Sequence, residues 1–326
     1  MNAIKSTLIL LALVGLSGCL SGAGPAGTTL QPKSWGYQLQ DADPDTLAAA
    51  GFDLVVIDYS RDGSVAGRYT RAEIEEIANS GTIPIAYISI GEAEDYRFYW
   101  QEEWKTDPLA WLGRENPDWD GNYKVCYWDP GWKGIVYSYL DKIISQGFAG
   151  VYLDIVDAFE YWSDPDNGEP FHLSEKEAAR RMIRFVEEIA AYCRKVHPGF
   201  YIIPQNGERI LDYDDGSFLN AISTIGIEDL FYDETERIPA SAVEYRLGYL
   251  ERIARAGRPV LVVDYVDDGT GYVGENRVRI DAFRAACRAH GFVPYAARAD
   301  RALDELNVIP GAQPICLPAP LQDTRL

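Results

Sequence analysis

Short apolar runs alternate with amphipathic segments along the chain from about residue 34 onward. A continuous apolar run is typical of a buried parallel strand, whereas apolar residues that recur about every 3.6 positions indicate a helix. Eight runs fit the strand pattern: 34–39, 54–59, 83–92, 150–154, 200–207, 222–228, 259–265 and 292–298. Helices are predicted between them, near 70–81, 132–146, 174–196, 240–256 and 276–290. This alternation predicts one closed (β/α)8 barrel over residues 34–326 rather than an open doubly wound sheet.

Local signals mark the ends of several helices. Thr70, followed by Glu73, forms a capping-box pattern. Ser174 precedes the longest predicted helix, and Pro198-Gly199 ends it. No Gly-x-Gly-x-x-Gly motif follows the first strand, so a dinucleotide-binding fold is disfavoured.

The connection after the third strand is unusually long. About forty residues separate Glu92 from the helix near Trp132, where two to six residues would be usual. This aromatic-rich insertion holds Tyr96, Phe98, Tyr99, Trp100, Trp104, Trp111, Trp119, Tyr123, Tyr127 and Trp128. It is either a packed minidomain that shields one edge of the barrel or a substrate-binding wall, since aromatic faces stack on sugar rings. The two interpretations are compatible.

Residues 1–18 have the pattern of a bacterial signal peptide. A lysine precedes an apolar run that is too short to span a bilayer stably. The Leu-Ser-Gly before Cys19 resembles a lipobox, in which the cysteine thiol receives a lipid. Residues 19–33 would then be the lipidated cysteine and a flexible tether. We expect an exported protein that is lipid-anchored to a bacterial membrane, at the outer membrane or cell surface. An ordinary signal peptide with an incidental cysteine is the alternative.

The chain carries a formal net charge of −20. Nucleic-acid binding needs Lys and Arg to neutralise phosphates, so no nucleic-acid partner is expected. The acidity indicates either solubility or a saline habitat, or else a cationic partner attracted by the field of the protein. Four further cysteines show no metal-ligand spacing, and the sequence does not choose among their pairings: Cys126, Cys193, Cys287 and Cys316.

Polar and acidic residues stand where the predicted strands end. The carboxyl ends of the strands of such a barrel meet at one rim, which carries the active site. Several carboxylates at one rim repel one another, and costs of this kind concentrate at functional sites. The residues concerned are Asp58, Glu92, Asp154, Asp157, Gln205, Asn206, Glu208, Glu228 and Asp264. For Asp157 and Glu208 a structural role, such as accepting backbone N–H bonds, is an open alternative.

The residue types absent from the strand ends narrow the reaction class. His172, His197 and His290 form no cluster with zinc-ligand spacing, so neither a metal nor a metal-dependent hydrolase is expected. No strand ends in Lys, which argues against Schiff-base chemistry. We expect no cofactor. Carboxylates rimmed by Tyr and Trp fit glycoside hydrolysis, in which two carboxyl groups flank the scissile bond.

Five motifs, in order along the chain, resemble glycoside hydrolase family 114, the endo-α-1,4-polygalactosaminidases. They are Val56-Ile57-Asp58-Tyr59, Ala86-Tyr87-Ile88-Ser89-Ile90-Gly91-Glu92, Gly150-Val151-Tyr152-Leu153-Asp154, Pro204-Gln205-Asn206-Gly207-Glu208 and Gly226-Ile227-Glu228-Asp229. The resemblance covers essentially the whole barrel. It implies a retaining, endo-acting enzyme with Asp154 as nucleophile and Glu228 as acid/base. Their carboxyl groups would then lie about 5–5.5 Å apart.

Further residues of the rim are expected to hold hydroxyl or amino groups of the sugar. These substrate-binding candidates are Tyr37, Asp58, Tyr59, Glu92, Asp157, Gln205, Asn206, Asp264 and Tyr265. An acidic rim would attract a partly deacetylated, cationic galactosaminan. Two alternatives stay open: a glycosidase that acts on a different α-linked glycan, and a surface carbohydrate-binding lipoprotein without turnover.

Overall fold

The structure, a computed structural model, describes residues 30–314. The predicted signal peptide (1–18), the lipidation site Cys19 and most of the predicted tether (19–33) lie outside the described residues, as does Cys316. Within the described range, no helix combines the length and the hydrophobicity needed to cross a membrane.

All eight predicted strands form, and they run parallel to their neighbours. They are β1 (Trp35–Tyr37), β2 (Leu54–Ile57), β3 (Ile83–Ser89), β7 (Gly150–Asp154), β8 (Tyr201–Pro204), β9 (Ile225–Glu228), β12 (Val260–Asp267) and β13 (Val293–Arg298). Most are buried on both faces, which explains why they read as continuous apolar runs.

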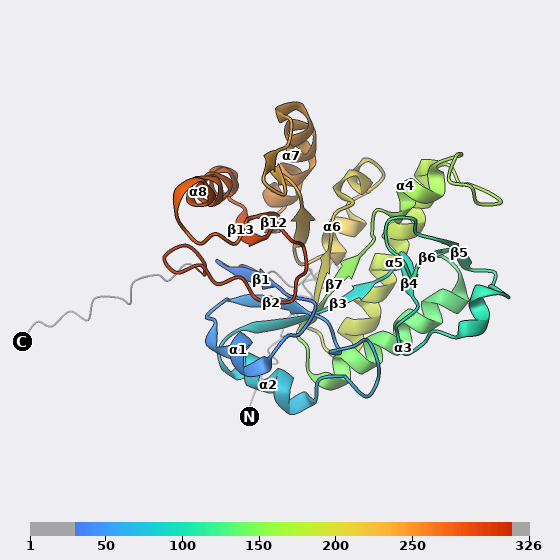
Figure 1. Ribbon diagram of the computed structural model, residues 1–326. Helices are drawn as coiled ribbons and strands as arrows, with labels where there is room; N and C mark the ends of the chain where they lie inside the picture. Colours follow the sequence, from blue (N-terminus) through green and yellow to red (C-terminus); the bar gives the residue numbers. More distant parts are fainter. Residues whose placement is uncertain (1–29, 315–326) are drawn as a thin grey trace, which may run out of the picture.

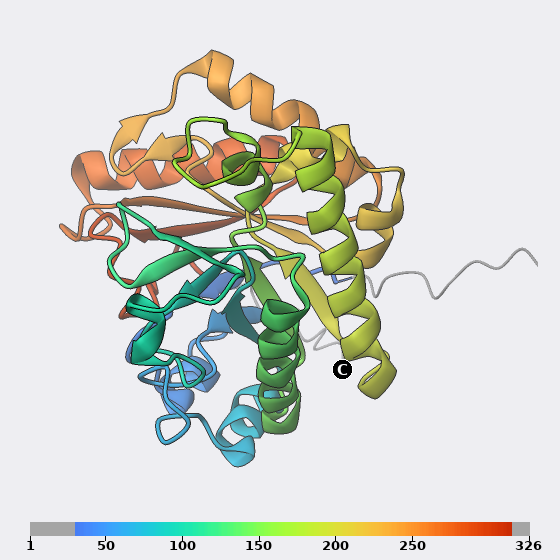
Figure 2. The ribbon, with the colours of Figure 1, turned by 90° about the vertical axis from the view of Figure 1, so that its right-hand side faces the viewer.

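The eight strands pair in two parallel sheets, in the order β1-β2-β3-β7-β8 and β9-β12-β13. A parallel bridge between Gln205 and Gly226 joins the end of β8 to β9. On the other side, the indole N–H of Trp35 in β1 donates to the backbone oxygen of Val293 in β13 at 3.0 Å. Helices surround these strands in Figures 1 and 2. The predicted (β/α)8 class is confirmed.

The helices that the sequence predicted also form. The α-helices are α1 (Pro44–Ala49), α2 (Arg71–Asn79), α3 (Pro130–Gln146), α4 (Ala158–Ser163), α5 (Glu175–Val196), α6 (Ser217–Ala221), α7 (Ala240–Arg255) and α8 (Gly274–Ala289). The described residues also form two 3-10 turns, η1 (Glu102–Lys105) and η2 (Glu208–Asp212), and a short hairpin of β10 (Tyr232–Asp233) and β11 (Glu236–Arg237). Thr70 and Glu73 make the predicted capping box of α2, and the side chain of Ser174 caps α5.

Large aromatic side chains fill part of the barrel interior. Trp35 packs against Tyr37, Tyr152 and Tyr295, with ring centroids 5.8–6.3 Å apart. Gly226 of β9 makes room for one of them, because a Cβ at this position would lie 2.0 Å from the hydroxyl oxygen of Tyr152. Large residues on one strand are thus matched by a glycine on another.

The aromatic-rich insertion is a small folded unit. It forms an antiparallel sheet of β4 (Glu92–Glu94), β5 (Leu112–Glu115) and β6 (Asn122–Val125) in the order β4-β6-β5, and it lies beside α4 in Figure 1. Most of its ten aromatic residues are buried or half-buried, some within this unit and some against the barrel helices, and only Tyr96 and Trp119 are exposed. The minidomain interpretation is therefore confirmed for most of the insertion, which leaves two aromatic rings free to contact a ligand.

Cys126, Cys193 and Cys287 are free and buried. Burial raises the pKa of the Cys126 and Cys193 thiols to about 12, so neither forms the reactive thiolate at neutral pH. These cysteines act as small apolar side chains of the core.

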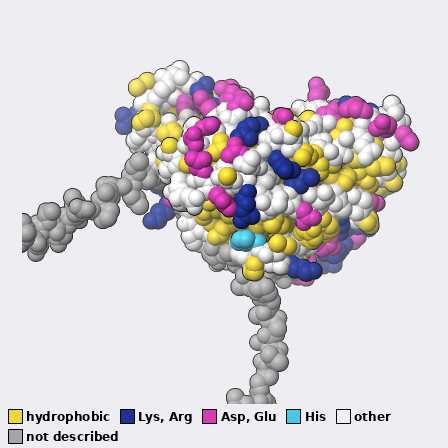
Figure 3. Space-filling model, turned by 90° about the horizontal axis from the view of Figure 1, so that it is seen from below, with side chains coloured by type: hydrophobic (Ala, Val, Ile, Leu, Met, Phe, Trp, Pro, Cys, Tyr) yellow, Lys and Arg dark blue, Asp and Glu magenta, His cyan; other side chains and the backbone are white. Residues whose placement is uncertain are grey.

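The face of the molecule seen from below in Figure 3 carries charged side chains of both signs. On the face shown in Figure 3, basic side chains lie among acidic ones, with hydrophobic side chains between them. The carboxylates that the sequence places at the strand ends lie elsewhere, at the rim of the barrel.

Candidate active site

A cavity of about 680 Å³ opens where the parallel strands end. Nine of the eleven predicted catalytic and substrate-binding residues line it: Tyr37, Asp58, Glu92, Asp154, Asp157, Gln205, Asn206, Glu228 and Tyr265. Since these residues come from strands far apart in the sequence, only the barrel brings them together. We refer to this space as the central cavity.

Asp154 is the last residue of β7, and its carboxyl group has two donors. The hydroxyl of Tyr87 in β3 donates to Oδ2 at 2.5 Å, and the backbone N–H of Ile155 donates to Oδ1 at 2.8 Å. Burial raises the pKa of Tyr87 well above its usual range, so this phenol stays protonated and remains a donor. The carboxyl of Asp154 is therefore held in one orientation towards the cavity.

Glu228 is the last residue of β9, and its carboxyl group is held from two sides. The hydroxyl of Tyr265 donates to Oε1 at 2.5 Å, and the side-chain amide of Gln205 donates to Oε2. Tyr37 extends this network, because its hydroxyl donates to Oε1 of Gln205 at 3.4 Å. The resulting chain fixes the amide orientation of Gln205 and the position of the Glu228 carboxyl.

Strained backbone follows each of these strand ends. Ile155, Asn206 and Asp229 have φ values of 57°, 54° and 50°, in the left-handed region that side-chain-bearing residues rarely adopt. Ile155 directly follows Asp154, and Asp229 directly follows Glu228. Strain of this kind persists where the surrounding structure imposes it, and it is concentrated at functional sites.

The pKa values of the two carboxyl groups are raised to different extents. Burial raises the pKa of Asp154 to about 6, although the hydrogen bonds from Tyr87 and Ile155 partly oppose it. Burial, with the nearby charge of Asp154, raises the pKa of Glu228 to about 7, against the hydrogen bond from Tyr265. Since the charge of one carboxyl group also raises the pKa of the other, the pair keeps one proton near neutral pH.

A buried ion-pair group forms one wall of the central cavity. Nη1 of Arg97 lies 2.6 Å from Oδ2 of Asp58, and its Nε lies 2.7 Å from Oε2 of Glu94. Only 1% of the Arg97 side chain is exposed. Glu92 is likewise paired with Lys124 of β6. The insertion thus supplies the cations that neutralise several carboxylates of the cavity.

Two predicted site residues lie outside the cavity lining. Asp264 is fully buried, and its carboxylate accepts the backbone N–H groups of Leu230, Phe231 and Tyr232 at 2.8–2.9 Å. The hydroxyl of Tyr59 donates to a backbone carbonyl oxygen at 2.6 Å, and its ring packs in the core. Both residues hold the loops in place, so the expectation that they touch the substrate is corrected.

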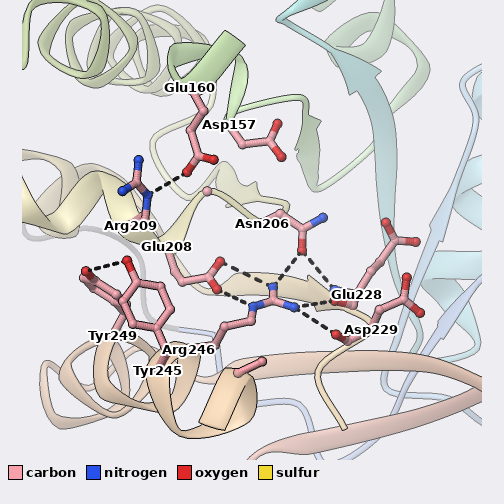
Figure 4. A pocket seen from close by; sticks show the side chains of 12 residues that line it. Asp157, Glu160, Asn206, Glu208, Arg209, Glu228, Asp229, Tyr245, Arg246 and Tyr249 are labelled. Carbon is pink, nitrogen blue, oxygen red and sulfur yellow. Dashed lines mark hydrogen bonds and ion pairs between the residues drawn. The ribbon is translucent and has the colours of Figure 1, made fainter. Parts of the chain in front are cut away.

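A second cavity of about 510 Å³ adjoins the central cavity (Figure 4). Arg246 of α7 crosses its floor: Nε lies 2.5 Å from Oε1 of Glu208, and Nη1 donates to the backbone oxygens of Glu228 and Asp229 at 2.9 Å. Glu208, for which the sequence leaves a structural role open, is therefore an ion-pair partner of Arg246. The cavity extends from Glu228 to the exposed ring of Tyr245.

Sequence reasoning did not find Tyr87, Arg97 or Arg246. Tyr87 lies inside one of the motifs of the family resemblance, but as a tyrosine in an otherwise apolar, buried strand it is not marked as a site residue. Arg97 and Arg246 meet partners 39 and 38 residues away in the chain, and no local pattern reveals such contacts. Among residues 30–314, no group of three His, Cys, Asp or Glu side chains is placed to hold a metal ion.

Comparison with known proteins identifies the family to which the chain belongs. A model of glycoside-hydrolase family GH114 matches residues 21–313. An uncharacterized protein of Methanocaldococcus jannaschii is 54% identical over 275 residues, which are 84% of this chain and 78% of that protein.

Two solved structures share the fold. The glycoside hydrolase domain of PelA from Pseudomonas aeruginosa has a TM-score of 0.64 and 19% identity, over 86% of this chain and 99% of the domain. Aspergillus fumigatus Ega3, in complex with galactosamine, has a TM-score of 0.60 and 18% identity, over 87% of this chain and 95% of that chain.

We predict that Glu228→Gln stabilises the protein more at pH 8 than at pH 4.5. The folded state raises the pKa of Glu228 to about 7 from an ordinary value of 4.5. The stability associated with its protonated form is therefore complete at low pH and is lost as the pH rises towards 7. The amide cannot ionise, so the variant avoids a loss of roughly 2–3 kcal/mol.

Thermal unfolding of parent and variant across this pH range measures the effect. Glu188→Gln serves as the control, since this exposed carboxylate pairs with Lys133 at the surface. A pH-independent difference between the parent and Glu228→Gln would contradict the predicted pKa shift.

Proposed function

The chain belongs to glycoside hydrolase family GH114, and from this premise we propose that it hydrolyses α-1,4-linked galactosamine polysaccharide. We propose endo action with retention of configuration. The observation that carries the proposal is the pair of Asp154 and Glu228 in one cavity, with their pKa values raised to about 6 and about 7. Near neutral pH this pair offers a carboxylate and a carboxylic acid, the two groups that glycoside hydrolysis needs.

In the proposed reaction, an oxygen of the Asp154 carboxylate attacks the anomeric carbon while Glu228 gives its proton to the glycosidic oxygen. The bond between that carbon and that oxygen breaks, and the leaving sugar departs as an alcohol. The Glu228 carboxylate then takes a proton from water, whose oxygen attacks the anomeric carbon and releases Asp154. Two successive displacements restore the α configuration.

The charge of the central cavity supports an amino-sugar substrate. Its lining carries eight acidic and three guanidinium side chains, although Glu92 is paired with Lys124 and Glu228 keeps its proton near neutral pH: Asp58, Asp62, Glu92, Glu94, Asp120, Asp154, Asp157 and Glu228 against Arg61, Arg97 and Arg301. This excess favours a cationic ligand, as a deacetylated galactosamine unit is at neutral pH. Ega3, which shares the fold, was solved in complex with galactosamine.

We predict that the soluble domain, produced from about Gly22 onward, releases oligosaccharides from galactosaminan, and that Glu228→Gln abolishes this release. The amide cannot donate the proton that the leaving group needs. Product analysis on partly and fully acetylated polymer measures the activity. NMR of the first products should show the α anomer, as retention requires.

Glu188→Gln, remote from the cavity, should cleave like the parent. Asp154→Asn should lose hydrolysis and keep binding. A parent that binds galactosaminan without cutting it would indicate a surface carbohydrate-binding protein. If the parent protein cuts only another α-linked glycan, the proposed substrate is wrong.

We predict a bell-shaped dependence of kcat/KM on pH, with limbs near pH 6 and pH 7. Activity rises as Asp154 ionises and falls as Glu228 loses its proton. Tyr265→Phe removes a hydrogen bond that lowers the pKa of Glu228, so the alkaline limb should move to higher pH. Tyr87→Phe should move the acid limb upward for the same reason. If each variant moved the opposite limb, the assigned roles would be exchanged.

We also propose that the protein is exported and anchored through a lipid on Cys19, because the Leu-Ser-Gly before this cysteine resembles a lipobox. We predict that Cys19→Ser moves the full-length protein from the membrane fraction to the soluble fraction of its bacterial host. Cys316→Ser is the matched control and should stay with the membranes. Equal membrane fractions for both variants would contradict lipid anchoring.

A further inference from the structure

We infer that the second cavity binds the sugar unit that leaves in the reaction, with the ring of Tyr245 as its platform and Asp157 as the partner of its amino group. This assignment rests on the proposed function and deepens it. It also gives the polysaccharide a direction in the cleft, with the reducing end over α7.

The division of the catalytic pair between the two cavities supports this direction. Asp154 lines only the central cavity, whereas Glu228 lines both. A nucleophile must reach the anomeric carbon of the sugar that stays, while the acid must reach the oxygen between that sugar and the leaving one. The sugar that stays therefore occupies the central cavity, and the leaving sugar occupies the second.

The second cavity offers a fixed aromatic surface. The Tyr245 side chain is 54% exposed. Its ring lies 5.4 Å from that of Tyr249, and the two hydroxyl oxygens are 3.3 Å apart. The Tyr249 hydroxyl also donates to Asp212 at 2.8 Å. A ring held at its edge and free on a face suits the apolar face of a pyranose, as Figure 4 illustrates for this pair.

The position of this platform is coupled to the catalytic residue. Arg246, the next residue in α7, binds the backbone oxygen of Glu228 and also reaches Oδ1 of Asn206 at 3.3 Å. The same Oδ1 accepts the backbone N–H of Glu228 at 3.0 Å. These contacts set the distance between the aromatic platform and the acid, as subsites of one substrate require.

The charges of the second cavity single out Asp157. Glu160 pairs with Arg209 at 2.9 Å, and Glu208 pairs with Arg246. Asp157 forms no salt bridge within residues 30–314. Burial raises the pKa of its carboxyl group to about 7, and the charge of Lys124 and the backbone N–H of Asp157 itself oppose this rise only in part. It lines both cavities beside Asn206 and Glu228. An ammonium group on the leaving sugar would supply the missing partner.

The lining of the central cavity includes two other exposed aromatic residues, Trp119 and Tyr96. Exposed rings therefore line both cavities. A cleft that holds sugar units on both sides of the cut suits internal cleavage of a polymer. The non-reducing part of the chain would lie towards the insertion.

The test compares two substrates with the same galactosamine oligosaccharide as the part that stays. One carries a further galactosamine as leaving group, and the other carries fluoride, which is too small to contact Tyr245. Tyr245→Ala should lower kcat/KM about tenfold for the sugar leaving group and leave the fluoride within about twofold. Trp119→Ala should lower both alike, because it acts on the part that stays.

Asp157→Asn should lower kcat/KM for a galactosamine leaving group and not for N-acetylgalactosamine. Tyr192→Ala is the matched control: this tyrosine also stacks on a neighbour, Tyr137, but on the outer surface of α3 and α5. Tyr192→Ala should leave kcat/KM unchanged for both the sugar and the fluoride leaving group. Equal losses for both leaving groups in Tyr245→Ala would overturn the assignment, and a loss confined to the fluoride would reverse the direction.

A binding measurement separates this assignment from the proposed activity. Calorimetry with a galactosamine oligosaccharide is performed on Glu228→Gln, alone and combined with Tyr245→Ala. If the parent cleaves nothing but Tyr245→Ala weakens binding about tenfold, the proposed activity fails and the binding site stands. If the parent cleaves and Tyr245→Ala changes neither binding nor rate, the binding site fails and the activity stands. Absence of binding overturns both.

Discussion

The hydrogen bonds from Tyr87 to Asp154 and from Tyr265 to Glu228, each 2.5 Å long, orient the two carboxyl groups that line the central cavity. Burial and like charge both penalise ionisation there. The phenols remain donors because burial raises their pKa values well above the usual range. Neutral donors orient each carboxyl without adding a positive charge, which would have lowered its pKa further. The pair can therefore keep one proton near neutral pH, and the chemistry depends on that proton.

The barrel provides the rigidity that this arrangement needs. Parallel strands end at one rim, and each carboxylate stands on the last residue of its strand. Left-handed residues follow at once, Ile155 after one strand and Asp229 after the other. Such a backbone costs on the order of 1–3 kcal/mol at each position. Close packing beneath the rim, including that of Tyr152 against Gly226, offsets this strain energy.

The partners of each carboxylate distinguish those with a structural role from those that are free to bind a ligand. Arg97 neutralises Asp58, and Arg246 neutralises Glu208. Asp264 is satisfied by backbone N–H groups. Asp157 forms no salt bridge among the described residues and lines both cavities. Most acidic side chains of the rim are thus neutralised by partners within the protein. A cationic sugar would meet the few carboxylates that have no such partner.

The sequence alone determined the strands, the long helices and the rim position of Asp154 and Glu228, because burial on both faces and helical periodicity are local properties. Their assignment as a pair came from the family resemblance. Only the tertiary structure decided that the side chains of Tyr59 and Asp264 are buried and hold neighbouring loops, since a residue at a strand end can face either the cavity or the next loop. It also decided that most insertion aromatics pack inward, and that Arg97 and Arg246 reach partners distant in the chain. Contacts of that range depend on how elements dock, and no short stretch of sequence encodes them.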